Sequence, residues 1–146
     1  MLSMMRRNLL SAVVLASVAA ATPVLAQTAS RSAKIQAVLQ VSDNDPAKWN
    51  LALNNARNVQ TDLGAANAEI EIVAYGPGIG MLKADSLTAN RIIDAMGQGI
   101  RVVACENTMT NQKIKREDMI DKIGYVKAGV VELMQKQREG WAYIRP

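Results

Sequence analysis

Cys105 is the residue of this sequence whose type and position indicate covalent chemistry. It follows a largely apolar run at 100–104, which predicts a strand that ends at the cysteine. A helical turn that begins at Asn107 or Thr108 would direct free backbone N–H groups at the sulfur and favour the thiolate, whereas the adjacent Glu106 carboxylate disfavours it. The residues leave two interpretations open, a reactive nucleophile and a buried cysteine that acts as a small apolar side chain.

The residue types that are absent exclude most other chemistry. The 146 residues contain no histidine and one cysteine. The lack of histidine excludes a Ser–His–Asp triad, a Cys–His pair and histidine ligation of a metal, and a single cysteine excludes an internal disulfide. We therefore expect neither a cofactor nor a metal site. A nucleic-acid partner is not expected either, because 17 basic residues face 13 acidic ones and aromatic residues make up only 3%.

Residues 1–26 have the features of a secretory signal peptide. Arg6 and Arg7 precede a long uncharged apolar segment, and small side chains just before residue 27 match a cleavage site. We expect an exported, periplasmic protein that keeps no stable membrane anchor after cleavage. The general secretory route is favoured, although the paired arginines also resemble a twin-arginine signal. Residues 27–32 are expected to form a flexible lead-in.

The remainder, residues 33–146, predicts a single α/β domain. Strands are expected at 34–41, 69–75 and 100–104, with shorter ones at 125–126 and 141–144, and helices at 46–63, 88–97 and 129–138, with a short one near 117–120. Apolar strands that alternate with helices of about three turns are typical of βαβ units. We predict a three-layer α/β/α fold with a mostly parallel sheet of about five strands.

Ligands of open parallel sheets bind at the carboxyl ends of the strands, where three predicted loops meet. The candidate binding residues in these loops are Asn44, Tyr75, Gly76, Gly78, Glu106, Asn107 and Thr108. The glycine-rich segment 76–80 lacks the spacing of a phosphate-binding or dinucleotide-binding motif, so we interpret it as a tight turn that leaves a cleft open. We expect the Cys105 sulfur to be open to solvent at this rim.

Four segments resemble the DsrE/DsrF-like family, the superfamily that includes bacterial sulfur-oxidation and sulfur-relay subunits. They are VSDNDPAKWNLALNNARN, IEIVAYGPGI, GIRVVACENTM and the ending GVVELMQKQREGWAYIRP. The piece around the cysteine, ACENTM, is the most specific. The ending is more similar to exported or uncharacterised members than to the cytoplasmic relay subunits, and Lys127-Ala128-Gly129 replaces a Pro-Ser-Gly-like turn, which leaves the last helix without an obvious side-chain cap.

The resemblance implies a domain that assembles into homotrimers or homohexamers. In sulfur-relay members, the cysteine that matches Cys105 carries sulfur as a persulfide and passes it to a partner protein. By resemblance, this chain is an exported sulfur carrier with a sulfur donor or acceptor protein as its partner, and at most a sulfurtransferase-like activity. The alternative is a non-catalytic homo-oligomeric module that binds a small molecule or peptide, with a structural Cys105.

Overall fold

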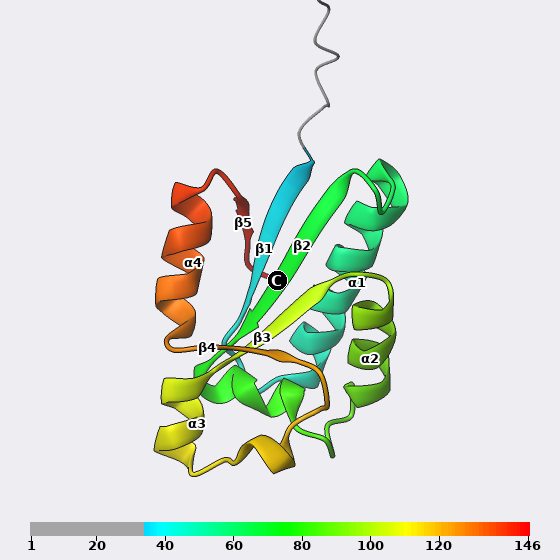
Figure 1. The fold of residues 1–146 in the computed structure, drawn as a ribbon. Helices are drawn as coiled ribbons and strands as arrows, with labels where there is room; N and C mark the ends of the chain where they lie inside the picture. The colour runs from blue at the N-terminus through cyan, green and yellow to red at the C-terminus, as the bar shows by residue number, and fades with distance from the viewer. Residues whose placement is uncertain (1–33) are drawn as a thin grey trace, which may run out of the picture. The chain divides into compact units, whose positions relative to one another are not determined.

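Five parallel strands form the sheet at the centre of the fold (Figure 1). They are β1 (Ile35–Val41), β2 (Ala68–Ala74), β3 (Arg101–Cys105), β4 (Gly124–Val126) and β5 (Ala142–Ile144), in the order β4-β3-β2-β1-β5. The computed structural model describes residues 34–146. The expected signal peptide and lead-in lie outside the described residues.

Helices cover both faces of the sheet. They are α1 (Pro46–Leu63), α2 (Ala89–Gly97), α3 (Glu106–Gln112) and α4 (Gly129–Arg138), with two 3₁₀-helices, η1 (Gly76–Leu82) and η2 (Arg116–Asp118). Helices α1 and α2 pack on one face and α4 on the other (Figure 1). The predicted three-layer α/β/α architecture is confirmed, and the sheet is entirely parallel. None of the helices between residues 34 and 146 has the length and apolar character needed to cross a membrane.

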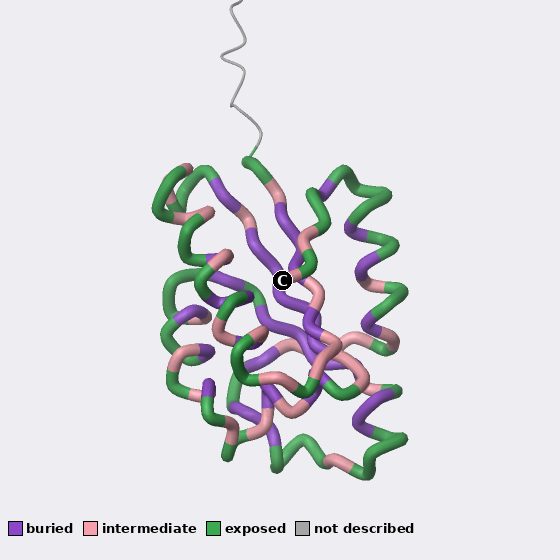
Figure 2. The backbone as a smooth tube through the Cα atoms, turned by 180° about the vertical axis from the view of Figure 1, so that it is seen from behind, coloured by how far each residue is buried: buried purple, intermediate pink, exposed green. Residues whose placement is uncertain are grey.

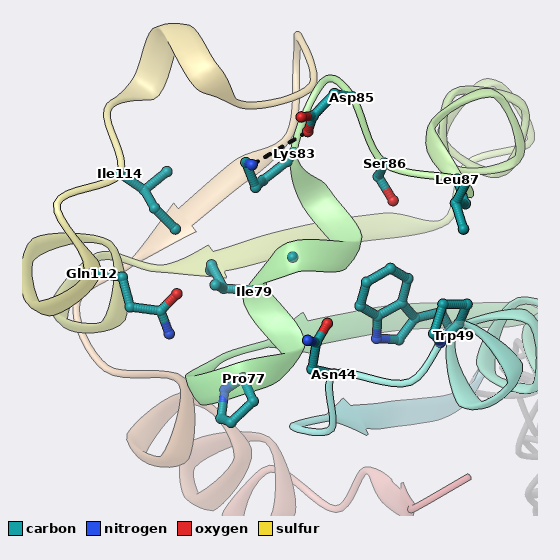
Figure 3. Close-up of a pocket in the computed structure, with 12 residues that line it drawn as sticks. Asn44, Trp49, Pro77, Ile79, Lys83, Asp85, Ser86, Leu87, Gln112 and Ile114 are labelled. Atoms are coloured by element: carbon teal, nitrogen blue, oxygen red, sulfur yellow. Dashed lines mark ion pairs between the residues drawn. The ribbon is translucent and has the colours of Figure 1, made fainter.

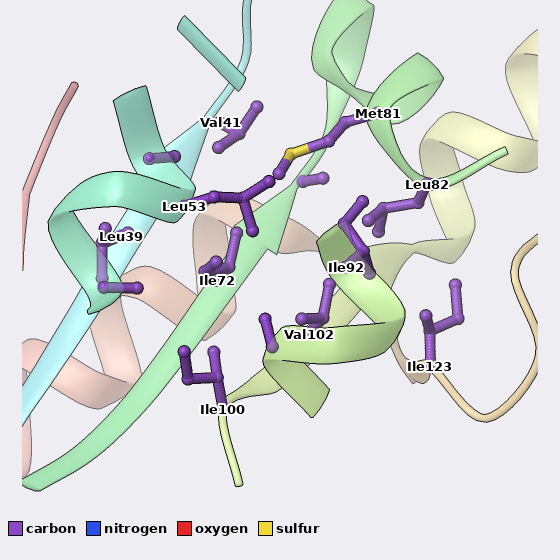
Figure 4. Close-up of a cluster of buried hydrophobic side chains, with 14 of the residues drawn as sticks. Leu39, Val41, Leu53, Ile72, Met81, Leu82, Ile92, Ile100, Val102 and Ile123 are labelled. Carbon is purple, nitrogen blue, oxygen red and sulfur yellow. The ribbon is translucent and has the colours of Figure 1, made fainter. Parts of the chain in front are cut away.

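The two faces of the sheet bury different amounts of apolar surface. On the α1 and α2 face a large cluster includes Leu39, Ile72 and Ile92 (Figure 4). On the α4 face the buried apolar cluster is small and consists of Val38, Val73, Val103, Leu133 and Trp141. Figure 2 shows the burial concentrated along the strands and the inner sides of the helices. Hydrophobic stabilisation scales with buried apolar area, so the hydrophobic free energy that holds α4 on the sheet is smaller than that which holds α1.

The start of α1 follows directly from the sequence. The Asp45 carboxylate accepts a hydrogen bond from the backbone N–H of Ala47 at 2.8 Å, and Pro46 occupies the first turn, where its missing N–H costs nothing. Gly64 ends the helix with a positive φ of 84°. The start of α4 is different, because its N-cap residue, Ala128, has no side chain that can accept a hydrogen bond.

Two segments differ from the predictions. Helix α3 begins at Glu106, directly after β3, and the predicted glycine-rich turn is the 3₁₀-helix η1. In α3 only Thr108 and Met109 are buried, so the segment has no apolar periodicity that would reveal a helix. In η1 the glycines and the proline indicated a turn, while the buried Ile79, among others, holds the segment against the core.

Candidate functional site

The sulfur of Cys105 lies at the carboxyl edge of the sheet, as the sequence predicts. Cys105 ends β3 and is the N-cap residue of α3, so the first N–H groups of that helix face its side chain. The backbone N–H of Thr108 donates a hydrogen bond to Sγ at 3.4 Å. The thiol in turn lies 3.9 Å from the backbone carbonyl of Lys127, to which it donates.

The start of α4 reaches the same sulfur from the other side. The carbonyl of Lys127, just before α4, lies 3.9 Å from Sγ, and the backbone N–H of Gly129, the first residue of α4, is close enough to lower the pKa of Cys105. A Cβ atom at position 129 would lie 2.9 Å from Cβ of Tyr75, so the close approach depends on glycine. The N–H of Asn107 donates to the carbonyl of Lys127 at 3.1 Å and joins the two helix starts.

These contacts set the protonation of the thiol. Burial raises the pKa of Cys105, but hydrogen bonds from the Thr108 side chain and from the backbone N–H groups of Gly129, Thr108 and Asn107 lower it by more. The pKa of the thiol therefore lies below its ordinary value of 9.0. No cationic side chain is among the main causes of this shift. Backbone dipoles and one hydroxyl favour the thiolate here.

The Thr108 hydroxyl is oriented by the segment after β2. Its Oγ1 accepts a hydrogen bond from the backbone N–H of Gly76 at 2.9 Å, which leaves its proton free to point at the sulfur. The side chain of Gln112 donates to the carbonyl of Gly76 at 3.1 Å. Gly76, a predicted site residue, thus fixes both ends of α3 and acts on Cys105 through Thr108.

Glu106 does not oppose the thiolate in the way its sequence position suggests. Its carboxylate forms an ion pair with Arg116 at 2.6 Å and is not among the main causes of the pKa shift of Cys105. The Glu106 carboxylate points along α3 toward Arg116 in η2, and this ion pair is partly exposed. Both facts explain why Glu106 disfavours the thiolate less than its sequence position suggests. The sign of the net shift, which the sequence left open, is downward.

The expectation of an open sulfur is not met. Cys105 is only 5% exposed, because the turn at 127–129 folds over it. Sγ nevertheless has two polar partners, the carbonyl of Lys127 and the N–H of Thr108. A reagent must therefore be small, or the turn at 127–129 must move, before the sulfur can react.

Not all of the predicted site residues lie beside the thiol. Asn44 lines an open cleft of about 600 Å³ beside the start of α1, together with Trp49, Lys83 and Gln112 (Figure 3). Lys83 is paired with Asp85 at 3.4 Å on one side of this cleft. Cys105 does not line it.

Tyr75 and Gly78 have structural positions. The ring of Tyr75 packs against Gly129, and burial is the main cause that raises the pKa of its hydroxyl. Gly78 is buried against the backbone of Val41 at the end of β1. Within residues 34–146, no group of three or more His, Cys, Asp or Glu side chains is placed to hold a metal ion.

Sequence reasoning did not place Lys127 and Gly129 in the site. Both contact the sulfur although they lie more than 20 residues from it in the chain. The signal was present in the turn 127–129, whose lack of a side-chain cap leaves the first N–H of α4 without a local acceptor. That free N–H is one of the groups that lower the pKa of Cys105.

Comparison with known proteins identifies the family. The family model described as the DsrE/DsrF-like family matches residues 34–146. The chain belongs to the DsrE/DsrF-like family. The resemblance seen in the sequence is thus confirmed, and it covers the whole DsrE/DsrF-like domain described above.

Solved structures agree with this assignment. A protein of unknown function from Methanobacterium thermoautotrophicum, MTH1491, is 34% identical, with a TM-score of 0.74 over 77% of this chain and 100% of that chain. BT1422 from Bacteroides thetaiotaomicron is 14% identical, with a TM-score of 0.62 over 76% of this chain and 94% of its own. The ychN protein from E. coli is 14% identical, with a TM-score of 0.61 over 78% of this chain and 99% of its own. The last two show the DsrE-like fold alone. No curated protein matches the chain.

Proposed function

We propose that this DsrE/DsrF-like protein is an exported sulfur carrier that holds sulfane sulfur on Cys105 as a persulfide. The supporting observation is the position of Sγ at the start of α3, where it accepts a hydrogen bond from the Thr108 N–H at 3.4 Å and where the surrounding backbone N–H groups and the Thr108 side chain lower the pKa of the thiol. The thiolate is the nucleophilic form in sulfur exchange. Export is proposed from the signal-peptide features of residues 1–26.

The proposed chemistry is an exchange that needs no external oxidant or reductant. The Cys105 thiolate attacks the outer sulfur of a donor persulfide, R–S–SH, and a new S–S bond forms while the S–S bond of the donor breaks. The electron pair leaves with R–S⁻, which then takes up a proton from solvent. A thiolate of the acceptor protein next attacks the outer sulfur of Cys105–S–SH and releases the Cys105 thiolate. The N–H groups around Sγ stabilise this leaving group, so a side-chain general base is not required.

Loading of the purified mature protein with a small persulfide, such as glutathione persulfide, tests the proposal. We expect intact-protein mass spectrometry to show a gain of one sulfur atom, which is lost on treatment with a reducing thiol. Cys105→Ser is expected to show no gain. An equal gain in Cys105→Ser, or no gain in the wild type, contradicts a persulfide on this residue. The same spectrum shows whether the mature chain begins at Gln27.

Homotrimeric or homohexameric assembly is part of the proposal. The outer side of α4 exposes Val130 (53%), Val131 (46%) and Met134 (59%), three apolar side chains on adjacent turns. A second copy of the chain would bury them. We expect light scattering to give a mass well above that of the monomer, and we expect the double substitution Val130→Glu, Met134→Glu to lower it.

The matched control for assembly is Asn58→Glu, which adds charge to the exposed side of α1 on the opposite face of the sheet. This variant is expected to keep the mass of the wild type. A monodisperse wild-type monomer would refute the assembly.

A second candidate function is a binding module that uses the cleft beside α1. Its volume of about 600 Å³ suits a small ligand, and the burial of Cys105 is the observation that favours a structural role for the thiol. Alkylation with iodoacetamide discriminates the two functions. Labelling of the native protein supports the sulfur carrier, whereas labelling only after denaturation supports the binding module.

A further inference from the structure

A fully buried carboxyl lies on the sheet beneath α4. Glu71, in the middle of β2, is 0% exposed, and neither of its carboxyl oxygens has a hydrogen-bond partner among the described residues. Its Oε2 lies 3.1 Å from Nη1 of Arg101 and 3.7 Å from Nζ of Lys136. A charge in such a place is costly unless the groups around it are held in position.

Lys136 links this carboxyl to α4. Its side chain is 11% exposed, and Nζ lies 3.7 Å from the Glu132 carboxylate, 3.9 Å from Glu139 and 4.3 Å from the centroid of the Trp141 ring. The charged groups that face Glu71 are therefore Arg101 from β3 with Glu132 and Lys136 from α4. On β1, the residue paired with Glu71 is the apolar Val38.

The same helix begins at Gly129, whose N–H lies near the Cys105 thiol. Gly129 at one end of α4 contacts Cys105, Leu133 packs in the small apolar cluster, and Lys136 near the other end meets Glu71. The seven residue steps from Gly129 to Lys136 span roughly 10 Å of rigid helix. Because the apolar contact of α4 with the sheet is small, the polar contacts of Lys136 with Glu71 contribute to fixing its position.

We propose that Glu71 and Lys136 are positioning residues for Cys105: they hold α4 on the sheet so that the N–H of Gly129 reaches the sulfur. This inference deepens the proposed function, since it concerns the same thiol. Its readout is the pKa of Cys105, which can be measured whether or not the protein carries sulfur.

Proton binding at Glu71 then acts on the thiol through the helix. Burial raises the pKa of Glu71 from 4.5 to about 7, the neighbouring Glu132 carboxyl adds to the effect, and the charges of Arg101 and Lys136 oppose it. The cluster changes its charge in the neutral range. The position of α4, and with it the hydrogen bond from Gly129 to Cys105, depends on pH in that range.

The first test measures how the alkylation rate of Cys105 varies with pH in Lys136→Met and Glu71→Ala. The midpoint of the profile is the readout, because a loosened helix also changes access to the sulfur and hence the rate itself. We expect the midpoint to rise by about one pH unit, which corresponds to the loss of roughly one hydrogen bond to the thiolate. Lys136→Arg keeps the cation and should restore the wild-type midpoint.

Glu139→Gln is the matched control, because it removes an exposed carboxylate that also faces Lys136. It should leave the midpoint unchanged. Folded Lys136→Met and Glu71→Ala proteins that keep the wild-type midpoint would overturn the proposal.

A second measurement uses the folded wild type. The amide resonance of Gly129 is expected to titrate with two inflections, one from Cys105 and one near pH 7 from Glu71, and the inflection near pH 7 should disappear in Glu71→Gln. A single inflection in the wild type overturns the proposal however the other variants fold. A failure of persulfide loading would leave this coupling intact, so the two proposals can fail separately.

Discussion

Gly78→Ala is expected to lower the free energy of unfolding by about 3 kcal/mol, the upper end of the usual cost of overpacking. A Cβ atom at this position would lie 2.4 Å from the backbone oxygen and 2.7 Å from the backbone carbon of Val41. These atoms belong to β1, and the same oxygen accepts a hydrogen bond from the N–H of Tyr75 at 3.1 Å. The strand cannot move aside without a loss of that bond, so η1 must shift instead. Urea unfolding at a fixed protein concentration measures the change.

Gly97→Ala serves as the control for this substitution. Gly97 is the last residue of α2, and a Cβ atom there would meet nothing within 4 Å. Alanine at a compatible helical position is expected to raise the free energy of unfolding by about 0.5–1 kcal/mol. If the two substitutions had equal effects, the close approach of Gly78 to β1 would not be what fixes η1.

The layers of the fold could be predicted because each long element carries its own signal. The strands β1 and β3 are runs of β-branched and aliphatic residues, and α1 has a cap and a proline at its start and a glycine at its end. The position of Cys105 at the rim follows from the end of β3 and the rule for parallel sheets.

The surroundings of Cys105 could not be predicted, because they depend on contacts between distant segments. Helix α3 has no apolar stripe, and it is fixed by two hydrogen bonds with Gly76, more than 30 residues away: the Gly76 N–H donates to the Thr108 hydroxyl, and the Gln112 side chain donates to the Gly76 carbonyl. The contact of Gly129 with the sulfur depends on where α4 crosses the sheet. No local pattern contains that information.

The burial of Glu71, on the α4 face of the sheet, could not be predicted from the sequence for the same reason. The segment 69–75 alternates at its start, which is typical of a strand with one face in water. The structure covers that face with α4 and buries Glu71 completely. The burial results from a helix nearly 60 residues later in the chain, and it gives the carboxyl a thermodynamic role that its sequence position does not indicate.

Glu71→Gln is expected to make the protein more stable than the wild type at pH 8, by up to about 3 kcal/mol. Burial raises the pKa of the carboxyl from 4.5 to about 7, so the folded protein keeps a proton that the unfolded chain has already lost in this window. The wild-type free energy of unfolding therefore falls as the pH rises from 4.5 to 7 and stays low above it. Each pH unit in the window contributes about 1.4 kcal/mol.

The neutral amide of Gln has the shape of the protonated carboxyl and cannot ionise, so this pH dependence should be absent in the variant. Urea unfolding of both proteins at pH 5 and pH 8 measures it, and the advantage of Glu71→Gln should shrink at the lower pH. Glu139→Gln, which removes an exposed carboxylate near the same lysine, is not expected to change the slope. An advantage of Glu71→Gln that is equal at both pH values would mean that Glu71 is already ionised in the folded state at pH 5. Arg101 and Lys136 would then compensate fully for the burial of its charge, and α4 would be held by a permanent ion pair with no dependence on pH.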